Sequence, residues 1–165
     1  MSINRIPRED ESANIAGLTL TMRRTVDASA SLLYEAWTNP RQLLDWWGPR
    51  GVRCVDAEVD LRVGGHYRIG NQLPDGRTVW ITGVFETVVP DRLLIYSWAV
   101  DAQPTQERVT VRFEPRGNAT EVVVVHERIV GATVRGDHER GWEGCLSRLA
   151  RLLESSWGAS RSSDS

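Results

Sequence analysis

Six residues could line an internal binding site, because each lies on the apolar side of a predicted strand or helix. They are Tyr67, Phe85, Tyr96, Trp98, His126 and Trp142. Filling the core is the more frequent role of any single aromatic residue. As a set, however, they carry more polar tips than a dry core favours, since each buried indole or phenol needs a hydrogen-bond partner. The pattern favours a partly polar pocket that takes a small apolar or aromatic molecule.

Three further residues are candidates for the same ligand-binding site. Ile69 lies on the same side of its strand as Tyr67. Cys145 lies on the apolar stripe of the last predicted helix, where a buried thiol is the simpler interpretation. Trp46 and Trp47 end a short helix near the predicted mouth of the pocket. One of this pair is expected in the core, and Trp47 is the candidate for closing the opening.

His126 is the one candidate whose usual pKa lies close to neutral pH. It shares a strand face with Val122 and Val124, so we expect it to be buried and mostly neutral. A lone histidine on an apolar face is more often a hydrogen-bonded core residue than a ligand contact. His66 and His138 are expected to be exposed and receive no role.

Known catalytic and cofactor motifs are missing from the sequence. There is no Gly-x-Ser-x-Gly elbow, no P-loop and no dinucleotide fingerprint. The residues four positions after His126 and His138 are Val130 and Trp142, so neither histidine begins a zinc-binding helix motif. The two cysteines are too far apart in sequence for a metal-binding pair. The sequence therefore predicts no catalytic residue, no metal and no cofactor, and it favours a binding protein over an enzyme.

Most of the elements that must position these residues are predicted strands. A strand over residues 18–26 precedes two short helices, the first after the cap residue Ser29 and the second after Asn39-Pro40. Six more period-two segments follow, and in the first of them Val55, Ala57, Val59 and Leu61 are expected to share a dry face. Short connections imply an antiparallel sheet, which curls when it is this wide.

The last predicted helix spans residues 137–156 and has one continuous apolar stripe. Starting from Trp142, the stripe continues through Cys145, Leu146, Leu149, Leu152 and Leu153. Asp137 is the predicted N-cap. We expect this helix to fill the concave side of the sheet, which makes the fold class α+β.

Length and charge indicate a single globular domain. The chain has 165 residues, 41% of them hydrophobic, and a net charge of -2, which gives no reason to expect nucleic acid as a partner. No signal peptide and no apolar run of membrane-spanning length are present, so we predict a cytoplasmic protein without membrane contact. The predicted organisation is a flexible segment (1–17), one domain (18–156) and a disordered tail (157–165). A homodimer is compatible with this organisation.

Several segments together resemble one known family. They are AWTNPRQLLDWWGP (36–49), DLRVGGHY (60–67), LPDG (73–76), GVFETVVPDRLLIYSW (83–98) and the pair Gly141-Trp142. With the element order, they resemble the helix-grip fold of the START and birch-pollen-allergen (SRPBCC) superfamily. The similar branch is the one related to the C-terminal domain of the activator of Hsp90 ATPase, which has many bacterial members. The resemblance covers residues 18–155.

The resemblance implies a seven-stranded sheet around the last helix, with a cavity between them that often takes an apolar ligand. Three functions follow as alternatives. Binding of a small hydrophobic or aromatic ligand is preferred. A polyketide cyclase or dehydratase would need His126, Tyr67 or Tyr96 as acid–base groups. A chaperone-activating domain ranks third, because few residues precede the first strand.

Overall fold

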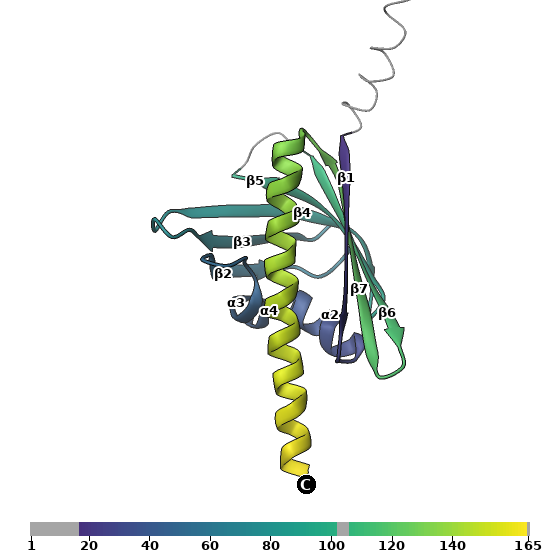
Figure 1. The fold of residues 1–165 in the computed structure, drawn as a ribbon. Coiled ribbons are helices and arrows are strands. Elements are labelled where there is room, and N and C mark those ends of the chain that lie inside the picture. Colours follow the sequence, from purple (N-terminus) through teal and green to yellow (C-terminus); the bar gives the residue numbers. More distant parts are fainter. Residues whose placement is uncertain (1–16, 102–105, 165) are drawn as a thin grey trace, which may run out of the picture.

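The protein forms a curved antiparallel sheet of seven strands with a long helix across one face (Figure 1). The computed structural model describes residues 17–101 and 106–164, so nearly all of the predicted flexible N-terminal segment lies outside the described residues. The elements are β1 (Leu18–Val26), α2 (Ala30–Thr38), α3 (Pro40–Trp46), β2 (Arg53–Val59), β3 (His66–Gln72), β4 (Thr78–Val89), β5 (Leu93–Val100), β6 (Glu107–Arg116), β7 (Ala119–Ile129) and α4 (Ala132–Asp164). The predicted α+β helix-grip architecture is confirmed.

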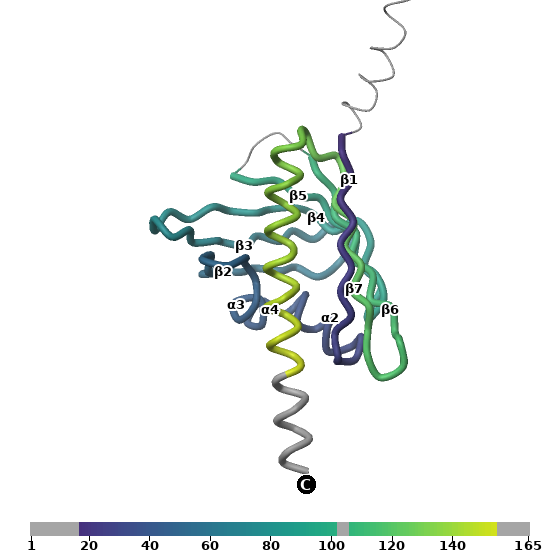
Figure 2. The backbone as a smooth tube through the Cα atoms, in the orientation of Figure 1, coloured from purple at the N-terminus to yellow at the C-terminus, as the bar shows by residue number. Residues whose placement is uncertain are grey.

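Strands β2 to β7 form a meander, and β1 is added at its end by pairing with β7, which is distant in sequence. Their order is β1-β7-β6-β5-β4-β3-β2, and every neighbouring pair is antiparallel. Leu18 lies opposite Ile129, and Val26 lies opposite Thr120. Figure 2 follows the chain through this path and shows the first and last strands side by side. The order leaves β1 and β2 as the two edges of the sheet.

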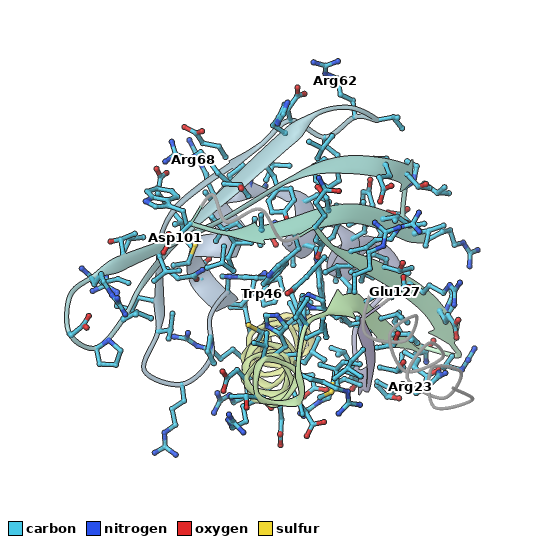
Figure 3. The ribbon with its side chains drawn as sticks, turned by 90° about the horizontal axis from the view of Figure 1, so that it is seen from above. Arg23, Trp46, Arg62, Arg68, Asp101 and Glu127 are labelled. Atoms are coloured by element: carbon cyan, nitrogen blue, oxygen red, sulfur yellow. The ribbon has the colours of Figure 1, made fainter. Side chains whose placement is uncertain are left out.

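The sheet arches over α4 when it is viewed along the helix (Figure 3). Trp46 lies between helix and sheet, whereas Arg23 and Arg62 lie on the outside. Irregular pairing in β1, β2 and β4 bends the sheet, because a bulge increases the local twist.

The irregularity in β2 overturns part of the predicted dry face. Pairing shifts between Cys54 and Asp56, so Cys54 is buried and Val55 is 39% exposed. Leu61 lies beyond the end of the strand and is also 39% exposed. The prediction that Val55 and Leu61 face the core is therefore wrong, since an extra residue reverses the alternation at Val55 and the strand ends before Leu61.

The long helix α4 buries the predicted stripe but has different ends. Trp142, Cys145, Leu146, Leu149 and Leu153 are all buried. The helix begins at Ala132 and runs to Asp164, so both predicted bounds are wrong, and residues 157–164 of the predicted tail are helical. Asp137 lies inside the helix and pairs with Arg140 instead of serving as a cap. No helix in the described ranges is long and apolar enough to cross a membrane.

The two short helices have the predicted caps. The hydroxyl of Ser29 accepts a hydrogen bond from the amide of Leu32 at 3.1 Å. The side-chain oxygen of Asn39 accepts one from the amide of Arg41 at 3.0 Å, and Pro40 opens the second helix. The caps define where the two helices begin. Helix α3 packs against β2 and α4, and this packing places its C-terminal tryptophans beneath the sheet.

Candidate functional site

A small pocket lies between the sheet and the two short helices. Its volume is about 20 Å³, which is close to the space needed by a single water molecule. It is lined by Trp37, Leu43, Trp47, Val59, Tyr67, Phe85, Tyr96 and Trp98. Pockets for drug-sized ligands typically span about 300–1,000 Å³. The pocket has an aromatic wall, but it is closed in this conformation.

Five of the nine predicted site residues line this pocket, namely Trp47, Tyr67, Phe85, Tyr96 and Trp98. The other four, Ile69, His126, Trp142 and Cys145, are buried but do not line it. Trp142 lies behind the pocket, because it stacks on Trp37 with ring centroids 5.9 Å apart and meets Trp47 edge-on at 5.4 Å.

Three lining residues, Trp37, Leu43 and Val59, are not among the predicted site residues. Val59 was predicted only as part of the dry face of a strand. Apolar periodicity marks such positions as buried, but it does not separate pocket lining from solid core. Trp46 is the core member of the tryptophan pair, since it is fully buried and its indole nitrogen donates to the carbonyl of Ala36 at 2.9 Å.

The polar groups of the pocket wall are the phenol hydroxyls and indole N–H groups of its aromatic residues. The hydroxyl of Tyr67 donates to the carbonyl of Ser97 at 2.7 Å, and the hydroxyl of Tyr96 accepts from Nε1 of Trp37 at 3.2 Å. The indole nitrogen of Trp98 is buried and has no partner among the described residues. Burial raises the pKa of Tyr67 and of Tyr96. Both phenols therefore keep their protons near neutral pH.

Behind Trp98, a chain of hydrogen bonds joins α4 to β7 and β6. Nε1 of Trp142 donates to Nδ1 of His126 at 3.0 Å. An indole N–H can only donate, so Nδ1 must accept and the ring proton is on Nε2. Nε2 of His126 lies 2.6 Å from Oε1 of Glu107, and Nε2 of His138 lies 2.8 Å from the same oxygen. These four residues are called the His–Glu cluster below.

The charges of the His–Glu cluster follow from burial and hydrogen bonding. Burial favours a raised pKa for Glu107, but the hydrogen bonds from His126 and His138 outweigh it and lower the pKa to about 2. Burial lowers the pKa of His126, and the bond to Glu107 only partly offsets this. At neutral pH the cluster holds one carboxylate beside a neutral His126, as predicted for that histidine.

One sequence-based expectation about this region is wrong. His138 was expected to be exposed, but its side chain is 15% exposed and bonded to Glu107. His126 is a buried and hydrogen-bonded residue as expected, with Glu107 and Trp142 as its partners. Glu107 itself was overlooked, although it lies two residues before Val109 and so falls on the same apolar strand face. An acidic residue on the apolar face of a predicted strand was the feature of the sequence that could have revealed this cluster. His66 is exposed as expected.

The ligating atoms of Glu107, His126 and His138 lie within 4.8 Å of one another, as in a metal site with two histidines and one carboxylate. A histidine that binds metal through Nε2 keeps a proton on Nδ1 and donates it to an acceptor. In this protein Nδ1 of His126 faces the N–H of Trp142 instead. The geometry fits a hydrogen-bonded cluster better than a metal centre.

The loop that follows Trp47 is fastened to α4. The guanidinium of Arg148 donates to the carbonyls of Gly48 and Val52 at 3.0 and 2.9 Å, and the amide of Gly48 donates to Sγ of Cys145 at 3.3 Å. Burial raises the pKa of Cys145 to about 12, so this thiol is structural and not nucleophilic. These contacts hold the loop that directly follows Trp47, a residue that lines the pocket.

Comparisons with known proteins agree with this architecture. The model of the family described as "Activator of Hsp90 ATPase homolog 1-like protein" matches residues 27–154. The crystal structure of protein CV1439 from Chromobacterium violaceum is 27% identical with a TM-score of 0.77, and the match covers 82% of this chain and 96% of that chain. PFC0360w from Plasmodium falciparum, described as an HSP90 activator, is 22% identical with a TM-score of 0.67, covering 84% and 97%.

A further similar structure is DynU16, described as a protein in the dynemicin biosynthetic locus. It is 21% identical with a TM-score of 0.70, and the match covers 84% of this chain and 48% of that chain. No curated protein matches the sequence. At this level of identity, structural likeness shows the fold and not the function. The family model matches well over half of the chain, because it includes α2, α3, six strands and most of the described α4. The chain belongs to the activator of Hsp90 ATPase homolog 1-like family.

Proposed function

We propose that the protein binds a small apolar or aromatic molecule in the pocket between the sheet and α3. The observation that carries this proposal is the construction of the pocket, in which aromatic side chains of β3, β4 and β5 face Trp47 of the α3 end. Binding sites for small molecules are mostly apolar with a few placed polar groups. The present volume of about 20 Å³ requires the pocket to widen before a ligand enters.

Displacement of Trp47 is the simplest way to widen the pocket. The residue caps a helix of seven residues and has an extended backbone at φ -67° and ψ 136°. Its loop is held to α4 through Arg148 and Cys145. Movement of this segment would leave the sheet intact, but it would separate Trp47 from its ring contacts with Trp46, Trp98 and Trp142.

The test asks whether uncharged aromatic compounds bind saturably. Binding is measured by the change in tryptophan fluorescence and by the change in melting temperature. A ligand that binds only the folded protein raises the melting temperature by mass action. Trp47→Ala should strengthen or accelerate binding, because it removes the side chain that closes the pocket. Leu44→Ala is the matched control on the same helix, since Leu44 is 44% exposed. Absence of saturable binding in both the wild type and Trp47→Ala would refute the proposal.

Binding is preferred over the cyclase alternative because the expected acid–base groups are already engaged. Both nitrogens of His126 have partners within the His–Glu cluster. Tyr67 and Tyr96 have raised pKa values caused by burial, so neither serves as a base near neutral pH.

A further inference from the structure

We infer that the ligand of this pocket carries a carbonyl or ether oxygen on an otherwise uncharged apolar body, and that Trp98 and Tyr96 of β5 hold this oxygen. The inference rests on the proposed function and specifies its ligand class. It starts from two hydrogen-bond donors, carried by residues that line the pocket, for which the described residues supply no acceptor.

The first unused donor is the indole N–H of Trp98. The residue is 6% exposed, it lines the pocket, and its Nε1 atom is without a partner among the described residues. Buried side-chain polar atoms in folded proteins nearly always have a partner. Because an indole nitrogen can only donate, its missing partner must be an acceptor.

The second unused donor is the hydroxyl proton of Tyr96. The oxygen accepts from Nε1 of Trp37, but no acceptor for its own proton is found among the described residues. Tyr67 differs, because its proton is donated to the carbonyl of Ser97. Tyr96 and Trp98 are two residues apart on one face of β5, so their Cα atoms are roughly 6.5 Å apart. Both residues line the same pocket, so one small molecule there can contact both.

The remaining pocket lining decides the charge of the ligand. No Asp, Glu, Arg or His is among the residues that line the pocket. A carboxylate or an ammonium ion would be buried there without a counter-charge, at a large cost in desolvation. The pocket chemistry therefore selects ketones, quinones and aryl ethers over acids, amines and plain hydrocarbons.

The experiment compares α-tetralone with tetralin, two bicyclic compounds that differ by one carbonyl group. Affinities are measured by tryptophan fluorescence and calorimetry. One net neutral hydrogen bond contributes about 0.5–1.5 kcal/mol, so α-tetralone should bind roughly 2- to 13-fold more tightly. Trp98→Phe and Tyr96→Phe should each reduce this ratio. Tyr34→Phe is the control, because its hydroxyl is also buried and unpartnered among the described residues but lies outside the pocket.

The outcomes separate this inference from the proposed function. Equal affinity of the wild type for the two compounds overturns the inference and leaves ligand binding intact. A ketone preference that survives in both Trp98→Phe and Tyr96→Phe overturns the assignment of the donors. Failure of both compounds to bind overturns the inference, and failure of the wider aromatic panel with Trp47→Ala overturns the proposed function as well. If one variant does not fold, the wild-type ratio and the other variant still decide.

Discussion

Nε1 of Trp142 donates a hydrogen bond of 3.0 Å to Nδ1 of His126 and thereby sets the tautomer of a fully buried histidine. The proton is left on Nε2, where it is directed at Glu107. A second proton on Nδ1 would point at the indole N–H, so the geometry itself opposes the imidazolium. The long helix is in this way joined to β7 and β6 by polar contacts as well as by packing.

We predict that His126 stays neutral until the pH is well below the usual histidine range. Its folded pKa lies below the usual 6.5, because burial outweighs the attraction of Glu107, and the neighbouring His138 also disfavours the charge. The unfolded chain therefore binds more protons, and stability falls as the pH drops from about 6.5 toward the folded pKa. NMR titration of the imidazole protons measures this directly. A folded pKa above 6.5 would contradict it.

Glu107 should add an acid-labile contribution at lower pH. Its pKa is lowered from the usual 4.5 to about 2, so its stabilisation is present above 4.5 and is lost as the pH falls toward 2. Glu107→Ala should remove that dependence and cost at least about 1–3 kcal/mol, because the N–H of His126 loses its buried partner. Urea unfolding at several pH values provides the measurement. Glu114→Ala on the same strand removes only an exposed pair with Arg116 and should change stability little.

Leu149→Ala should destabilise the protein by about 2–5 kcal/mol, because the side chain is fully buried in the face of α4 that meets the sheet. Leu32→Ala makes the same chemical change on α2, where the leucine is 41% exposed, and should have a much smaller effect. Denaturant midpoints of the two variants are the comparison. Similar losses would mean that α4 does not form the core contact described above.

Two glycines of α4 should respond in opposite ways to alanine. Gly144→Ala places a Cβ atom 2.8 Å from Cα of Pro49, so the loop must move away from the helix. Gly141→Ala meets no atom within 4 Å and should stabilise the helix by up to about 1 kcal/mol. Thermal melts test the stabilities. If the loop closes the pocket, Gly144→Ala should also speed ligand association, and an unchanged rate would count against that role.

The fold was largely predictable because its signals are local. The period-two strands, the caps at Ser29 and Asn39 and the apolar stripe around Leu149 each depend on a few neighbouring residues. The bulge at Cys54 was not predictable, since register is decided by pairing with β3. The start of α4 at Ala132 was missed because its first turn lacks acidic residues and an apolar stripe.

The candidate site was predictable only as a set of buried positions. Which residues line the pocket depends on how α3 docks, and that contact joins segments far apart in sequence. Glu107 and His138 come from β6 and α4, so no spacing rule connects them. Pocket volume was the least predictable quantity, because it depends on how side chains of the sheet and the short helices pack together and not on composition.

The pairing of β1 with β7 has a consequence for synthesis. Of the seven strands described, β1 leaves the ribosome first, yet its hydrogen-bonding partner β7 (residues 119–129) leaves last. Strands β2 to β7 can pair with sequence neighbours as they appear, but the first strand must wait with its edge open. We expect chains that are arrested before Ala132 to remain protease-sensitive, since neither α4 nor a completed sheet covers the core. Protection should appear abruptly once the helix is released, and protection of shorter arrested chains would disprove this order.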